Sequence, residues 1–93
     1  MDFNKIKTDY PRTYKIWKGS EYYDLKNERR LYDFFDENGI YVIIDDIWEW
    51  YIKVDEYGDG RYLYEAMGVC DSRTECEEEA FEKAFEILND KLS

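Results

Sequence analysis

Hydrophobic residues recur with a helical period near both ends of the chain and alternate with polar residues between them. Tyr10, Tyr14 and Trp17 lie at i, i+4 and i+7, and this stripe predicts a helix over residues 10–18. Asp9 precedes the stripe and is a typical N-cap residue. A helix this short is marginal in water, so the stripe must pack against the rest of the protein.

A second stripe predicts a helix over residues 25–37. Leu31, Phe34 and Phe35 share its apolar face, and Asp24 is the expected cap. The following Asn38-Gly39 pair is a helix stop signal, because glycine readily takes the left-handed conformation after a helix.

The last helix has the clearest pattern. Ser72 and Glu75 have the spacing of a capping box, in which each side chain satisfies a backbone N–H of the other residue. We therefore predict a helix over Arg73–Lys91. Its apolar face consists of two neighbouring rows: Ala80, Ala84 and Leu88, and Phe81, Phe85 and Leu92.

Three strands are predicted between the helices, over Ile40–Ile44, residues 47–55 and residues 61–67. The first is apolar on both faces, whereas the other two alternate with period two. Residues 57–60 are typical of a hairpin turn. The alternation predicts two sets of residues that each share one face: Trp48, Trp50, Ile52 and Val54; and Tyr62, Tyr64 and Ala66.

The predicted order is α-α-β-β-β-α, which indicates the α+β class. We expect a single domain over residues 1–93, with a three-stranded antiparallel meander packed against the C-terminal amphipathic helix. The predicted core contains Phe35, Trp50, Phe81, Ala84 and Leu88.

The charge is unevenly distributed. The chain has 23 acidic and 13 basic residues, a net charge of −10. Residues 1–30 carry 8 bases and 5 acids, whereas residues 31–93 carry 5 bases and 18 acids. This balance opposes direct binding to nucleic acid, because such binding neutralises phosphates. There is no histidine, which removes the commonest metal ligand and the usual general base. We expect no enzyme activity and no cofactor.

The N-terminal residues show no apolar signal segment, and no apolar run is long enough to span a membrane. We therefore expect a cytoplasmic protein. Cys70 and Cys76 are expected to be reduced there, although their spacing also permits a disulfide. Two thiols without histidine do not complete a zinc site.

Two carboxylate groupings have an ordinary structural explanation. Asp55, Asp59 and Gly60 fit the first, fifth and sixth positions of a calcium loop, but Tyr57 and Ala66 occupy its third and twelfth positions. A hairpin turn explains the segment without a metal. Residues 45–49 contain three carboxylates that could perform acid–base work, although an aspartate-rich turn is the more ordinary interpretation.

The polar side of the last helix carries an acidic face. Like charges at i, i+4 repel along it, and Lys83 is the one base at the right spacing to offset them directly. A solvated helix surface is the ordinary interpretation, and an anionic surface that imitates nucleic-acid phosphates for a basic host protein is the functional one. The candidate protein-binding residues are Glu75, Glu78, Glu79, Glu82 and Glu86.

The aromatic residues of the strands allow a second kind of contact. Trp48, Trp50, Tyr62 and Tyr64 could stack on bases, but few basic residues accompany them, and a core role is favoured. If the helices cover one face of the sheet, the other face, around Tyr51 and Leu63, could pair with another chain.

Two segments, residues 30–40 and residues 79–88, resemble blocks in small proteins of unknown function that gut-bacterial phages and mobile elements encode. The Tyr10-Pro11 helix start is similar as well. The resemblance implies a phage or mobile-element origin and transfers no site residue. We therefore expect a small accessory protein that binds a protein through its acidic face. A self-associating structural module and a nucleic-acid-mimicking inhibitor of a basic host protein are the alternatives.

Overall fold

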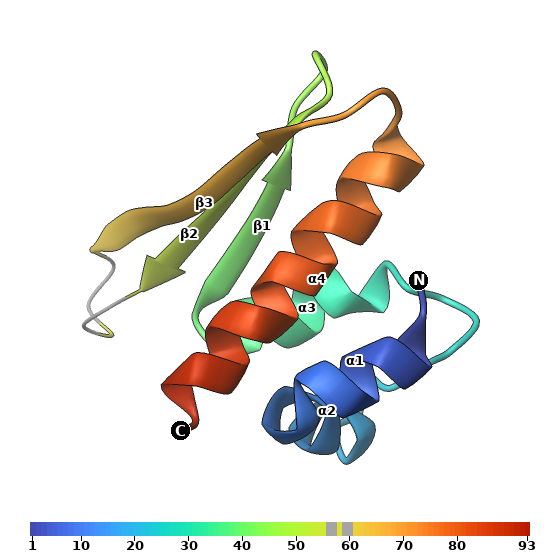
Figure 1. Cartoon of the computed structure of the whole chain (residues 1–93). Coiled ribbons are helices and arrows are strands. Elements are labelled where there is room, and N and C mark those ends of the chain that lie inside the picture. Colours follow the sequence, from blue (N-terminus) through green and yellow to red (C-terminus); the bar gives the residue numbers. More distant parts are fainter. Residues whose placement is uncertain (56–57, 59–60) are drawn as a thin grey trace.

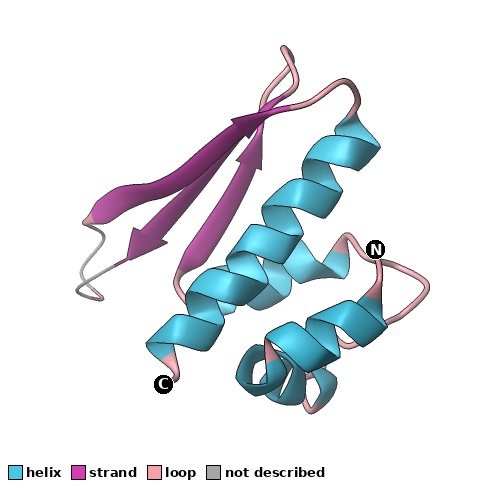
Figure 2. Ribbon diagram, viewed as in Figure 1, coloured by secondary structure: helices cyan, strands magenta, loops and turns pink. Residues whose placement is uncertain are grey.

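The computed structural model describes residues 1–55, 58 and 61–93. The elements follow the order α-α-α-β-β-β-α (Figures 1 and 2). They are α1 (Phe3–Asp9), α2 (Pro11–Lys18), α3 (Arg30–Glu37), β1 (Ile40–Ile44), β2 (Glu49–Asp55), β3 (Tyr62–Val69) and α4 (Arg73–Lys91).

The predicted α+β fold is confirmed. The strands form an antiparallel sheet in the order β1-β2-β3, and the helices lie on one side of it (Figure 1). The core lies between this side of the sheet and α4, and the five predicted core residues are all buried in it. Burial of apolar surface in this layer, at ~25 cal/mol per Å², is the main driving force for folding.

Helix α1 was not predicted. Its N-cap is Asp2, whose carboxylate accepts the backbone N–H groups of Asn4 and Lys5 at 3.0 and 3.2 Å. Ile6 is the one buried residue of α1, so the sequence shows no apolar stripe there. The assignment of Asp9 as a cap was wrong, because Asp9 is the last residue of α1.

Helices α1 and α2 are attached to α4 through a cluster of rings around Trp17, which is fully buried. Its indole lies 4.9 Å from the Phe3 ring and 5.7 Å from the Phe85 ring, measured between centroids. Thr13 adds a buried hydrogen bond, in which its hydroxyl donates to the Phe85 carbonyl at 2.8 Å. The predicted stripe on residues 10–18 therefore packs on the last helix.

Helix α3 is shorter than predicted, because it begins at Arg30 and not at residue 25. The Asp24 carboxylate accepts the N–H of Lys26 at 2.9 Å, which forms a local turn and does not cap a helix. Leu25 is exposed. The predicted stop is confirmed, since Gly39 has φ +77° directly after α3 and Asn38.

The faces of β3 differ from the prediction because the sheet contains a bulge. Ile52 pairs with Ala66, whereas the next residue, Lys53, pairs with Tyr64. Glu65 is therefore an extra residue, and it reverses the alternation on its N-terminal side. Tyr62 and Tyr64 lie on the face away from the helices, and their predicted place on the same face as Ala66 was wrong. The predicted place of Leu63 on the same face as Tyr51 was also wrong, because Leu63 pairs with the buried Val54 and lies on the helix side.

The two tryptophans of the aromatic stripe predicted as core also have different environments. Trp50 is buried, and its indole lies against Gly68 of the neighbouring strand. Trp48 lies before β2 with φ +58° and is 38% exposed. It belongs to the turn that joins β1 and β2, where the Asp45 carboxylate accepts the N–H groups of Ile47 and Glu49 at 3.0 and 3.3 Å. The turn interpretation of these aspartates agrees with this geometry.

The expectation of reduced cysteines also differs from the structure, which joins Cys70 and Cys76 in a disulfide. Cys70 follows β3 and Cys76 lies in the first turn of α4, with Cα atoms 5.5 Å apart. Ser72 caps α4 between them, so the cap and the disulfide together fix the connection between sheet and helix.

Candidate functional site

The acidic face of α4 is partly neutralised by bases from other parts of the chain. The Met1 amino group lies 3.2 Å from Glu78, and Lys5 Nζ lies 2.7 Å from Glu82. Lys83 contacts Glu86 at 3.1 Å rather than Glu79, the partner suggested by the i, i+4 spacing. Three of the five predicted carboxylates therefore hold α4 to the N-terminus and α1 or pair within α4.

The other two predicted carboxylates have different surroundings. The Glu75 carboxylate accepts the N–H of Asp71 at 3.1 Å, so it serves the helix N-terminus but does not close the predicted box with Ser72. Glu79 borders a small hollow of about 240 Å³, whose other lining residues are Tyr10, Trp50, Glu82, Lys83 and Glu86. The structure therefore does not present the five carboxylates as one uniform anionic row.

Glu77 is a buried carboxylate on the inner side of α4 that was not among the predicted site residues. The Tyr32 hydroxyl donates to Glu77 at 2.9 Å, and Arg29 and Arg73 lie 3.6 and 3.9 Å from it. Burial, followed by the hydrogen bond to Glu77, raises the pKa of Tyr32 well above its usual value. The position was detectable, because residue 77 lies four residues before Phe81 on the apolar face of the helix.

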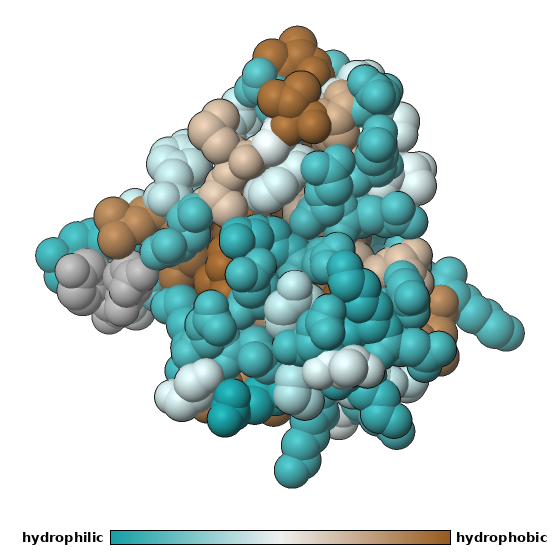
Figure 3. Space-filling model, viewed as in Figure 1, coloured by the Kyte–Doolittle hydropathy of each residue, from teal (hydrophilic) through white to brown (hydrophobic). Residues whose placement is uncertain are grey.

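The face of the sheet opposite the helices is uncovered by any described segment (Figure 1). It carries exposed apolar and aromatic side chains, with Tyr64, Met67 and Val69 being 68, 65 and 69% exposed. Figure 3 shows a largely hydrophilic surface over α4 and α1, with hydrophobic atoms at the β1–β2 tip and toward the β3 side. We call this face together with the outer edge of β3 the open sheet surface. Its outward side chains are Tyr41, Ile43, Glu49, Tyr51, Lys53, Tyr62, Tyr64, Met67 and Val69.

The outer edge of β3 presents backbone groups that no described strand pairs. The Cys70 N–H donates to the Trp48 carbonyl at 2.9 Å, which shows that Cys70 points toward β2. Because antiparallel positions alternate, Gly68 and Ala66 also point to β2, and Met67 and Val69 direct their N–H and C=O groups away from it. This edge can accept a further strand.

A hollow of about 560 Å³ lies beside this edge, at the bulge. Tyr51, Tyr64, Ala66 and Met67 provide its apolar walls, and Glu65 provides a carboxylate. The Tyr51 hydroxyl donates to Glu49, and this hydrogen bond, followed by burial, raises the pKa of Tyr51 to about 12. Lys53 lies 5.2 Å from the centre of the Tyr64 ring, a cation–π contact.

The described residues contain no group of three or more acidic or cysteine side chains placed to hold a metal ion. Residues 56, 57, 59 and 60 of the segment compared with a calcium loop lie outside the described residues. The Asp55 carboxylate accepts the Gly58 N–H at 2.8 Å. In the described part of the chain, each helix is too short or too polar to cross a membrane.

Comparisons with protein-family models, curated proteins and solved structures found no match. The resemblance to phage and mobile-element proteins therefore stays a prediction. The geometry defines a class of protein: a small α+β protein in which the described residues leave one face of the sheet uncovered and the outer edge of β3 without a paired strand.

Proposed function

We propose that this protein acts by binding another protein, and that an extended segment of the partner adds to β3 as a fourth strand. The observation that carries the proposal is the outward direction of the Met67 and Val69 backbone groups on an uncovered face. Addition of a strand to a free sheet edge is a recurrent mode of peptide recognition, in which backbone hydrogen bonds provide affinity and side-chain hollows provide specificity.

The size of the surface is adequate for such a contact. The exposed fractions of Ile43, Tyr62, Tyr64, Met67 and Val69 leave roughly 600 Å² open, if a fully exposed large side chain offers about 200 Å². A standard interface buries ~800 Å² on each partner. The backbone of β3 and the rim of the hollow contribute further area.

The chemistry of the partner follows from charge and shape. The net charge of −10 attracts a basic chain over long range, and Glu65, which lines the hollow, would pair with a lysine or arginine of the added strand. The apolar walls of the hollow favour a large apolar side chain beside that base. We propose a basic partner segment in which apolar and basic residues alternate, in agreement with the expected basic host protein and phage accessory role.

The acidic face of α4 is a weaker candidate for the contact. Met1 and Lys5 offset the charges of Glu78 and Glu82, so these two carboxylates do not form a free binding row. An inhibitor that imitates nucleic acid would need those carboxylates at a partner's surface. The open sheet surface therefore supports the protein-binding function better.

The test compares selection from a random displayed-peptide library on the wild type and on Met67→Pro. Proline at position 67 removes an edge N–H that no described strand uses, so the internal ladder stays intact. Met67→Thr is the matched control, since it removes the apolar side chain but keeps the N–H. We expect the wild-type protein to select peptides in which apolar and basic residues alternate. These peptides should bind Met67→Thr with several-fold lower affinity and should not bind Met67→Pro.

Two results would contradict the proposal. Selected peptides that bind Met67→Pro as tightly as the wild type would exclude strand addition at this edge. A dimer in light scattering that Met67→Pro dissociates would show that the edge binds a second copy of this chain, which is the self-associating alternative.

A further inference from the structure

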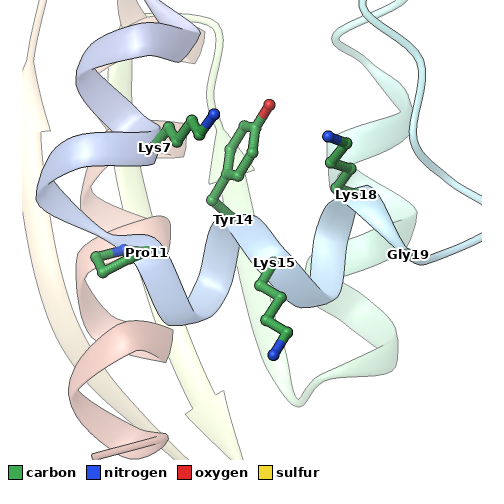
Figure 4. A pocket seen from close by; sticks show the side chains of 6 residues that line it. All are labelled: Lys7, Pro11, Tyr14, Lys15, Lys18 and Gly19. Carbon is green, nitrogen blue, oxygen red and sulfur yellow. The ribbon is translucent and has the colours of Figure 1, made fainter.

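A second surface, separate from the sheet, gathers basic residues on α1 and α2. It is a hollow of about 480 Å³, and we call it the basic hollow (Figure 4). The residues that line it are Lys7, Pro11, Tyr14, Lys15, Lys18 and Gly19.

The lysines of the basic hollow are not neutralised by the described part of the chain. Lys5 and Lys83 each contact a glutamate within 3.1 Å, but no described carboxylate lies within ion-pair distance of Lys7, Lys15 or Lys18. The chain has 23 acidic residues for 13 basic ones. Three uncompensated lysines around one hollow therefore form a local positive site on an acidic protein.

Two of these lysines lie beside the same tyrosine ring. Figure 4 shows Lys7 and Lys18 on either side of the Tyr14 ring, with their side chains extending beside it, whereas Lys15 points away. The pKa of Tyr23 is raised by burial and then by a hydrogen bond with Tyr14, and both Lys18 and Lys7 act to lower it. Both ammonium groups therefore lie within electrostatic range of Tyr23, the hydrogen-bond partner of Tyr14.

Helix dipoles explain part of this arrangement. Lys7 lies in the last turn of α1, and Lys15 and Lys18 lie in the last turn of α2, where positive charge is favoured. A dipole effect requires only that each lysine lie near its own helix end. It does not require that Lys7 and Lys18, from different helices, flank one tyrosine ring.

We propose that the basic hollow binds a phosphate group. Lys7 and Lys18 would supply the positive charge, and the Tyr14 hydroxyl would donate a hydrogen bond to a phosphate oxygen, because charge-assisted hydrogen bonds to phosphate are the strong ones. Pro11 and the Tyr14 ring provide apolar contact for whatever carries the phosphate. The same chemistry fits free phosphate and a phosphate monoester with an aromatic ring.

The test is a titration of the full chain with inorganic phosphate, in which NMR chemical shifts are recorded at each phosphate concentration. Sodium chloride keeps the ionic strength constant. Phenyl phosphate is titrated in parallel, and tighter binding of it would identify a monoester as the source. We expect saturable chemical-shift changes at Lys7, Tyr14 and Lys18. The double variant Lys7→Gln/Lys18→Gln should bind phosphate at least tenfold more weakly than the wild type.

The matched control is Lys26→Gln/Lys91→Gln, which changes the net charge equally at two exposed lysines outside the hollow. Tyr14→Phe removes the proposed donor but keeps the ring, and we expect it to weaken phosphate binding while preserving the fold. Equal shifts with phosphate and chloride would overturn the proposal. Equal weakening by the two double variants would also overturn it, because it would show a long-range effect of net charge and no site.

Discussion

The contact between Trp50 and Gly68 allows a strict test of how the sheet packs. A Cβ atom at position 68 would lie 2.5 Å from both Cε2 and Nε1 of the Trp50 indole, and 2.7 Å from its Cζ2. The indole is buried, and its Nε1 has no hydrogen-bond partner among the described residues. Gly68→Ala must therefore displace a rigid ring that fills the core.

The expected magnitude follows from two opposing effects. Over-packing of a core costs ~1–3 kcal/mol, whereas alanine is favoured over glycine within a strand by ~0.5–1 kcal/mol. We expect the free energy of unfolding to fall by about 1–2 kcal/mol, which in a domain of this size lowers the melting temperature by about 5–15 °C. Urea unfolding followed by far-UV circular dichroism measures this directly.

Gly19→Ala is the matched control. Gly19 has φ −84°, and an added Cβ would meet only the backbone oxygens of Lys15 and Ile16, at 3.6 and 3.9 Å. We expect this variant to be neutral or more stable by up to ~1 kcal/mol, because alanine reduces the entropy of the unfolded chain.

A double-mutant cycle identifies the clash. In a Trp50→Leu background, Gly68→Ala should cost less than in the wild type, with a coupling of at least ~0.5 kcal/mol. If Gly68→Ala stabilises the protein as Gly19→Ala does, or costs the same in both backgrounds, the indole does not lie on Gly68 and our account of the sheet is wrong.

Four further predictions test the core, the disulfide, the acidic face and the tyrosines. Phe81→Ala should cost ~3–5 kcal/mol in urea unfolding, because Phe81 is fully buried; a loss below ~1 kcal/mol would contradict its place in the core. Reduction should lower the free energy of unfolding by ~2–3 kcal/mol, the entropic value for a loop closed by residues six apart, and alkylation without reductant should find no free thiol. Changing Glu78, Glu82 and Glu86 to Gln should slightly lower the melting temperature, because it removes ion pairs worth up to ~1 kcal/mol each as well as the repulsion between the glutamates. A clear rise in melting temperature would show that the repulsion dominates. The pKa of Tyr51 is raised from 10.0 in the unfolded chain to about 12 in the folded state, so the folded state holds this proton more tightly. The stabilisation from the protonated hydroxyl is complete below pH 10 and is lost as the pH rises through about 12. Tyr51→Phe should therefore reduce the fall in melting temperature over this pH range.

Local patterns were sufficient for most of the elements. The capping residue Ser72 and the apolar rows of α4 predicted Arg73–Lys91, and the structure has the same bounds. The stop at Gly39 and the strand Ile40–Ile44 were correct for the same reason, since periodicity and turn chemistry act over a few neighbouring residues. The predicted core followed from these stripes, because a stripe must be buried against something.

The candidate sites depended on contacts that sequence patterns do not encode. A single extra residue at Glu65 moved Tyr62 and Tyr64 to the uncovered face, and alternation alone cannot show where pairing slips by one position. The acidic residues of α4 are visible in the sequence, but their neutralisation by Met1 and Lys5 joins residues 77 positions apart. Helix α1 buries one side chain, so beyond the Asp2 cap its stability comes from packing on α2 and α4 and not from an apolar stripe. The sequence determined the elements, and tertiary packing decided which of their surfaces remained free.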